Sequence, residues 1–121
     1  MPHLILEYSD NLNVKEGFNT LFKQLHYLLA EMLPTPLDNC KSRCMPQKMF
    51  FIGDQNPTNA FVHLTIKIKA GRADSLKTFL GEKALNLLTE FFKEKKRDLK
   101  INISVEILDL DGHYFKSQIS D

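Results

Sequence analysis

The chain is poor in the residues that mark several protein classes. Its 121 residues include two cysteines, five glycines, five prolines and no tryptophan. Two cysteines are too few for a disulfide framework, and the dispersed glycines form no phosphate-binding loop. No stretch approaches the roughly 18–20 apolar residues that span a bilayer, and the N-terminus lacks the pattern of a secretory signal. These absences favour a protein of the reducing cytoplasm with no membrane partner.

The charged residues are balanced in sign. Sixteen lysines and arginines oppose fifteen aspartates and glutamates, which gives a net charge of +1 at pH 7. So small a net charge creates no global field that attracts a nucleic-acid backbone, and we expect no nucleic-acid partner. Hydrophobic residues make up 43% of the sequence, which is enough for one buried core. At this length we expect a single domain over residues 1–121.

Two segments carry apolar residues at spacings of three and four, the pattern of an amphipathic helix. The first helix is predicted to follow a capping box of Asn13 and Glu16 and to end near Pro34. The second is predicted to be capped by Asp74. The apolar positions are Val14, Phe18, Leu21, Phe22, Leu25, Leu28, Leu29 and Met32 in the first segment, and Leu76, Phe79, Leu80, Ala84, Leu87, Leu88, Phe91 and Phe92 in the second.

Four segments are predicted to be strands. Residues 60–69 alternate most clearly, with Val62 and Leu64 on one face and Phe61 and His63 on the other. Residues 2–8 form a short apolar strand, and a last strand alternates through Ile101, Ile103, Val105 and Ile107. Residues 39–52 are predicted to form a strand with a break near Pro46, followed by a turn or loop.

The order strand, helix, strand therefore occurs twice, in pseudo-repeats of roughly 2–52 and 60–109. Pro2-His3-Leu4, for example, lies 60 positions before Val62-His63-Leu64. This order predicts an α/β (α+β) fold in which a duplicated βαβ unit places both helices on one face of a single sheet. The pattern leaves two interpretations of the other face open: a half-solvated surface, or the contact of a symmetric oligomer.

Position two is the first candidate for chemistry. Methionine before a small residue is commonly removed in cells, and its removal would free the secondary amine of Pro2. An α-amino group has a pKa of about 7.7–8.0, which burial or nearby cations lower. A neutral amine at pH 7 is a usable general base. The structural alternative is a proline at the start of an edge strand, where it costs no ladder hydrogen bond.

Three cations are candidates for binding an anionic substrate. Lys41 and Arg43 lie two positions apart and would share one face of an extended segment, while Arg72 lies in a turn after the clearest strand. Guanidinium groups bind carboxylates bidentately, although each of the three could also be an ordinary solvated charge. The histidines lack zinc-site spacing, and Cys40 and Cys44 favour reduced thiols, so we expect no metal.

Four motifs taken together carry a family resemblance. They are MPHLILEYSDN at the start, Ser42-Arg43, FVHLTIKIKAGR at residues 61–72, and Phe115-Lys116. In these motifs the chain resembles the 5-carboxymethyl-2-hydroxymuconate Δ-isomerase family of the tautomerase superfamily. The resemblance runs nearly end to end and is weakest over residues 33–59. Its most specific parts are the opening MPH and the strand that ends in AGR.

The resemblance implies a fold, an assembly and a reaction. The fold would be a tautomerase-like four-stranded main sheet with two helices on one face, and three chains would form a homotrimer. Processed Pro2 would be the catalytic base, Arg72 would bind a substrate carboxylate, and Lys41 or Arg43 would hold another. The reaction would move a proton in a polycarboxylate dienol from homoprotocatechuate, a step of aromatic-compound degradation. No metal or organic cofactor would be needed.

One position departs from the family pattern, and two other functions stay open. Members often have R-S-R where this chain has Lys41-Ser42-Arg43, and lysine keeps the charge but lacks the bidentate fork. The chain could therefore be a tautomerase of another 2-oxo or enol acid. It could also be a non-enzymatic oligomeric ligand-binding module of ferredoxin-like layout, which has the same βαββαβ order. A binding module should tolerate a residue before Pro2, whereas an enzyme that uses the Pro2 amine should not.

Overall fold

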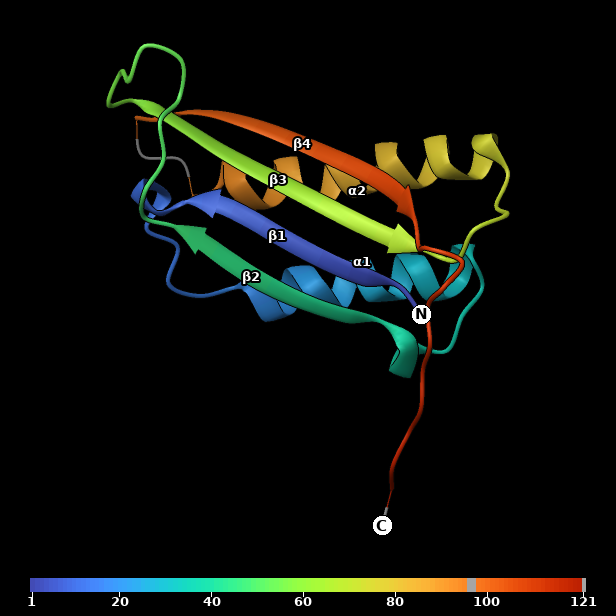
Figure 1. The fold of residues 1–121 in the computed structure, drawn as a ribbon. Coiled ribbons are helices and arrows are strands. Elements are labelled where there is room, and N and C mark those ends of the chain that lie inside the picture. Colours follow the sequence, from blue (N-terminus) through green and yellow to red (C-terminus); the bar gives the residue numbers. More distant parts are fainter. Residues whose placement is uncertain (96–97, 121) are drawn as a thin grey trace.

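The computed structural model describes residues 1–95 and 98–120, and these contain two α-helices and four strands in the predicted order (Figure 1). The elements are β1 (His3–Ser9), α1 (Phe18–Met32), β2 (Lys41–Gln47), β3 (Asn59–Ile68), α2 (Asp74–Lys93) and β4 (Lys100–Asp109). Two short 3-10 helices, η1 (Asp10–Leu12) and η2 (Leu37–Asn39), lie beside α1 in the chain.

The four strands form one mixed sheet in the order β2-β1-β3-β4. β1 runs parallel to β2, β3 runs parallel to β4, and the central pair β1 and β3 is antiparallel. A helix connects the strands of each parallel pair, so the predicted duplication of a βαβ unit is confirmed. In a ferredoxin-like split βαβ layout, another strand would separate each parallel pair. The parallel strands here are direct neighbours, which excludes that layout.

Both helices cover the same face of the sheet, as predicted, and the core lies between the helices and that face (Figure 1). The helix-facing residues of the central strands β1 and β3 are buried, those of the edge strands β2 and β4 are partly buried, and a stripe on each helix packs against them. The main core residues are Leu4, Leu6, Val62, Leu64, Ile66 and Ile68 from the strands, and Leu21, Leu25, Leu29, Leu80, Ala84, Leu88 and Phe92 from the helices. Phe61 and His63 lie half-buried on the uncovered face.

The two predicted helix caps are wrong. α1 begins at Phe18, and Asn13 instead ends η1 with a left-handed φ of 52°. The residue before α1 is Gly17, whose φ of +98° favours glycine and whose added Cβ would meet Phe91 at 3.0 Å. Asp74 is the first residue of α2 and makes no capping bond, although its charge suits a helix start. None of the helices described is long and apolar enough to cross a bilayer.

The second strand is shorter than predicted. β2 ends at Gln47, and the apolar run Met49-Phe50-Phe51-Ile52 lies outside any strand. The register explains this, because Gln47 pairs with the last residue of β1, Ser9, and no partner strand lies beyond it. Pro46 does not interrupt β2, since an edge strand tolerates a residue that cannot donate to the ladder. Met49 is consequently 92% exposed.

We expect Leu64→Ala to lower the free energy of unfolding by about 2–5 kcal/mol, since it opens a cavity in a fully buried position of β3. Leu85→Ala on α2 is the matched control, because Leu85 is 37% exposed and surface changes usually stay within about 0.5 kcal/mol. Urea unfolding at one fixed protein concentration measures both. Equal losses in the two variants would contradict the assignment of the core.

Candidate active site

The start of the chain lies at one end of the sheet, where several segments meet. β1 and β2 are parallel, so both begin there, and β3 and β4 run the other way and end there. Figure 1 shows the N-terminus beside the start of β2 and the ends of β3 and β4, with the C-terminal tail passing next to it. The topology thus gathers the three predicted regions of the site: residues 2, 41–43 and 72.

Pro2 is buried at this end, and Met1 is half-buried. The Pro2 carbonyl accepts a hydrogen bond from the Lys41 amide at 3.1 Å, which holds the first residues against β2. The Pro2 ring nitrogen is bonded to Met1 in this structure, so the free amine belongs to Met1. The pKa of that amine is lowered to about 6.

Burial is the largest cause of the lowered pKa of the Met1 amine. The charges of Lys116, Lys41 and Arg72 lower this pKa further, while Cys40 opposes them. Burial and neighbouring cations both disfavour an ammonium ion. This end of the sheet therefore favours a neutral amine, and its positive charges attract anions.

Lys41 and Lys116 line an open cavity of about 410 Å³ beside the N-terminus. The Lys41 ammonium donates to the carbonyls of Asp38 and Asn39 at 3.2 and 3.4 Å, and that of Lys116 donates to the Asn39 side-chain oxygen at 2.9 Å. Each ammonium has three donors, so each retains at least one for a ligand. Asp38 lines the same cavity, so two lysines face one acidic residue there and the balance of charge favours an anionic group.

Arg72 lies half-buried in the turn that follows β3. The preceding Gly71 has a φ of +98°, and a Cβ there would meet nothing within 4 Å. Glycine is therefore favoured by the backbone conformation and not by a lack of space. The Arg72 guanidinium donates to the carbonyl of Leu33 at the end of α1. That bond fixes the side chain and leaves further guanidinium donors for a substrate.

Arg43 lies on the same face of β2 as Lys41, as predicted, but its guanidinium is hydrogen-bonded to a histidine. Its Nη2 lies 2.8 Å from Nδ1 of His3, and Nε2 of His3 lies 2.8 Å from the Tyr114 hydroxyl. Burial, and next the charge of Arg43, lower the pKa of His3. Arg43 lies two positions further along β2 than Lys41, and the charges that lower the pKa of the N-terminal amine include Lys41 but not Arg43.

Tyr114 and Lys116 are site residues that the sequence reasoning did not select. Within the tail at residues 111–120, Tyr114 alone is not exposed. It lines the 410 Å³ cavity and also a second cavity, of about 200 Å³, that includes Met1. The signal available in the sequence was the Phe115-Lys116 motif, of which Phe115 is 88% exposed and Lys116 contributes to the cavity.

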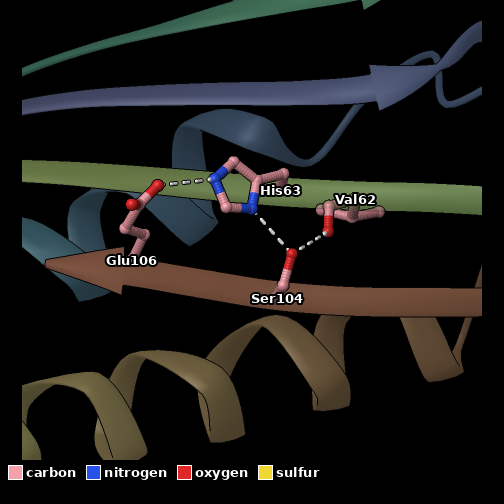
Figure 2. Close-up of polar contacts among 4 residues, drawn as sticks. All are labelled: Val62, His63, Ser104 and Glu106. Atoms are coloured by element: carbon pink, nitrogen blue, oxygen red, sulfur yellow. Dashed lines mark hydrogen bonds and ion pairs between the residues drawn. The ribbon is translucent and has the colours of Figure 1, made fainter.

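A second polar cluster joins β3 and β4 on the uncovered face (Figure 2). Nδ1 of His63 lies 2.7 Å from the Ser104 hydroxyl, and its Nε2 lies 3.3 Å from the Glu106 carboxylate. His63 pairs in register with Glu7, four residues along β1 from His3 and hence about 13 Å away. The cluster is a cross-strand connection that lies apart from the N-terminal site.

The described residues contain no group of three histidine, cysteine or acidic side chains that could hold a metal ion. Cys40 is buried and Cys44 half-buried, and both are free thiols. Burial raises the pKa of each thiol, which keeps it protonated and of low reactivity.

Two adjacent βαβ units in one four-stranded sheet form a tautomerase-like fold. A solved structure described as a fused 4-OT wild type symmetric trimer shares this fold at a TM-score of 0.66 and 14% identity. The match covers 89% of this chain and 85% of that one.

The family is shown by closer relatives. The family model for 5-carboxymethyl-2-hydroxymuconate isomerase matches residues 2–120. The 5-carboxymethyl-2-hydroxymuconate Delta-isomerase of Escherichia coli is 31% identical over 110 residues, which cover 91% of this chain and 87% of the relative. A solved isomerase from Deinococcus radiodurans R1 has a TM-score of 0.84 and 30% identity over 97% of this chain and 90% of that one. This chain belongs to the 5-carboxymethyl-2-hydroxymuconate isomerase family and is an enzyme of the isomerase class, which confirms the resemblance.

In the chain that retains Met1, we expect Lys116→Gln to raise the pKa of the amine from about 6, because one of the cations that disfavour the ammonium is removed. Titration of the amine by NMR measures this. Lys83→Gln is the matched control, since Lys83 is exposed on α2 and is not among the charges that act on the amine. An unchanged pKa in the Lys116 variant would contradict the cationic environment described above.

Proposed function

We propose that this chain isomerises 5-carboxymethyl-2-hydroxymuconate, or a closely similar dienol, during homoprotocatechuate degradation, with the Pro2 amine as general base after removal of Met1. The observation that carries the proposal is the environment of the N-terminus. Burial and the charges of Lys116, Lys41 and Arg72 lower the pKa of the terminal amine to about 6. Removal of Met1 would leave the Pro2 amine beside the same groups, and the names of the relatives support the substrate.

The proposed reaction moves one proton and needs one base. The neutral Pro2 amine accepts the proton of the substrate 2-hydroxyl, and the electron pair of that O–H bond enters the conjugated chain as a dienolate. The same nitrogen, now protonated, returns the proton to a carbon further along the chain, where a C–H bond forms and the 2-oxygen becomes a ketone. An amine of lowered pKa accepts and releases a proton near neutral pH, as a general base requires.

The cations have separate tasks in this proposal. Arg72 binds a substrate carboxylate with guanidinium donors that its bond to Leu33 leaves free. Lys41, with Lys116, binds a second carboxylate in the 410 Å³ cavity. Arg43 adds positive charge on the same strand and retains donors beyond its bond to His3. Together these charges stabilise the dienolate.

We further propose that the chain is one tautomerase-like domain over residues 1–121 and assembles as a homotrimer through the uncovered face. The half-buried Phe61 and His63 on that face support an interface, and so does the fold shared with a protein described as a symmetric trimer. A trimer could bring cations of a neighbouring chain to each site. We propose the cytoplasm as its compartment, in keeping with two free thiols.

A second candidate substrate class is another 2-oxo or enol acid. Lys41 favours this alternative, because an ammonium binds a carboxylate as a point charge and discriminates its orientation less than a guanidinium does. The non-enzymatic module loses its support, since the sheet is not ferredoxin-like and the family is one of isomerases.

We expect Pro2→Ala to lower kcat for 5-carboxymethyl-2-hydroxymuconate, because the primary amine left at position 2 is no longer held by a ring and is a less well positioned base. The decay of the dienol absorbance measures turnover, on protein shown by mass to lack Met1. Wild-type protein that retains Met1 has no basic nitrogen at Pro2 and should lose more, about 10²-fold or more, because a positioned base typically contributes 10²–10⁴-fold. Full activity with Met1 in place would rule out the Pro2 amine as the base.

We expect Arg72→Ala to raise KM for the dicarboxylate substrate far more than for a monocarboxylate analogue, because one carboxylate contact disappears. Arg72→Lys should recover part of the loss, since the charge remains without the bidentate fork. Lys93→Ala at the end of α2 removes a distant cation and serves as the control. Equal changes in KM for both substrates would exclude Arg72 as a carboxylate ligand.

A further inference from the structure

We propose that the Tyr114 hydroxyl donates a hydrogen bond to the 2-oxygen of the substrate. A chain of hydrogen bonds from Arg43 through His3 to Tyr114, called the relay below, orients this hydroxyl. The inference rests on the proposed function, because it adds one residue to the same site. Tyr114 would be a catalytic residue that touches the substrate, and His3 and Arg43 would be positioning residues that act through it.

The direction of the relay follows from which groups can donate. A guanidinium has donors and no acceptor, so its 2.8 Å contact makes Nδ1 of His3 the acceptor. A histidine that accepts at Nδ1 is neutral and carries its proton on Nε2. Nε2 therefore donates to the Tyr114 oxygen at 2.8 Å. The hydroxyl proton of Tyr114 is not used in that bond and is free to point to a ligand.

The surroundings of His3 agree with this protonation state. Burial and the charges of Arg43, Lys41, the N-terminus and Lys67 all lower the pKa of His3 and favour the neutral ring. The ring of Tyr114 packs edge-on against that of His3, with centroids 5.8 Å apart and an interplanar angle of 71°. Two contacts thus fix the tyrosine, although the tail around it is exposed.

The position of Tyr114 identifies the substrate atom that it meets. It lines both the cavity with Lys41 and Lys116 and the cavity with Met1, so it lies between the carboxylate-binding cations and the N-terminus. Consider a substrate that places one carboxylate on those lysines and its 2-hydroxyl at Pro2. The 2-oxygen is next to that carboxylate in the substrate, so it would lie beside Tyr114. This oxygen gains negative charge in the dienolate, so a donor there binds the dienolate more strongly than the substrate. The tyrosine proton stays on Tyr114 throughout.

A pair of unreactive probes tests the contact independently of turnover. 2-Oxoglutarate and glutarate are both dicarboxylates, and the former also carries a 2-oxygen acceptor. By calorimetry on protein without Met1, we expect the wild type to bind 2-oxoglutarate about 3- to 10-fold more tightly, as one hydrogen bond allows. Tyr114→Phe should abolish this preference. Tyr27→Phe, the same change at an exposed residue of α1, should retain it.

Kinetics with the hydroxymuconate substrate test the relay. We expect Tyr114→Phe to lower kcat by roughly 100-fold, at the lower end of values for loss of one oxyanion donor, with a smaller change in KM. His3→Phe, which keeps a ring without nitrogens, should lower kcat in the same way. The double variant should have the same kcat as Tyr114→Phe, because the two changes remove the same interaction with the substrate. Additive losses would overturn the relay.

The outcomes separate this inference from the proposed function. Turnover by the wild type without a preference for 2-oxoglutarate, or with an unchanged kcat in Tyr114→Phe, would overturn the role of Tyr114 and leave the proposed function standing. A preference that Tyr114→Phe abolishes, without turnover by the processed wild type, would support the Tyr114 contact and reject the hydroxymuconate reaction.

Discussion

The antiparallel pairing of β1 with β3 is the constraint on which the site depends. It places the first residues of the chain beside the end of β3, so that Pro2 and Arg72, seventy positions apart, share one end of the sheet. The parallel pairing of β2 with β1 sets Lys41 opposite His3. Buried residues of β1 and β3 hold the central pairing, so the core fixes the position of the N-terminal amine. The cations come from less buried segments, with Arg72 in a turn and Lys116 in the tail.

The positive charges at the N-terminal end of β1 are not neutralised by ion pairs with carboxylates of the described residues, so they remain available to a ligand. Lys41, Lys116 and Arg72 all donate to neutral oxygens, from backbone carbonyls or from the Asn39 amide. In the described part of the chain, the carboxylates that contact a basic side chain are Glu106 with His63, Asp109 with Lys77 and Asp111 with His113. A cation that is oriented by a neutral carbonyl leaves a net positive charge at its place, whereas a cation paired with a carboxylate forms a pair with no net charge. The same unpaired charges lower the pKa of the amine and attract a carboxylate substrate.

The fold was predictable where one periodicity decides the structure. Alternation in residues 60–69 and the helical spacing from Phe18 to Met32 each describe a single element against one core, and the structure agrees with both. The errors arose where a distant segment decides. Helix α1 starts at Phe18 because Gly17 adopts a left-handed φ close to Phe91, and β2 stops at Gln47 because β1 offers no further partner. Phe91 lies far along the chain from Gly17, and β1 lies far from Met49, so the patterns around Asn13 and Met49 do not reveal these two limits.

The sequence by itself determined the element order, the duplication, the buried faces and a short list of candidates that includes Pro2, Lys41 and Arg72, since period, charge and motif are local properties. Only the tertiary structure decided how these residues meet. It brought the tail back to the N-terminus, so that Lys116 joined the cations and Tyr114 met His3, more than a hundred positions away. It also bound Arg43 to His3 instead of leaving it beside Lys41 at the cavity. Strand pairing and chain reversal set these contacts, and neither has a signature within a few residues of sequence.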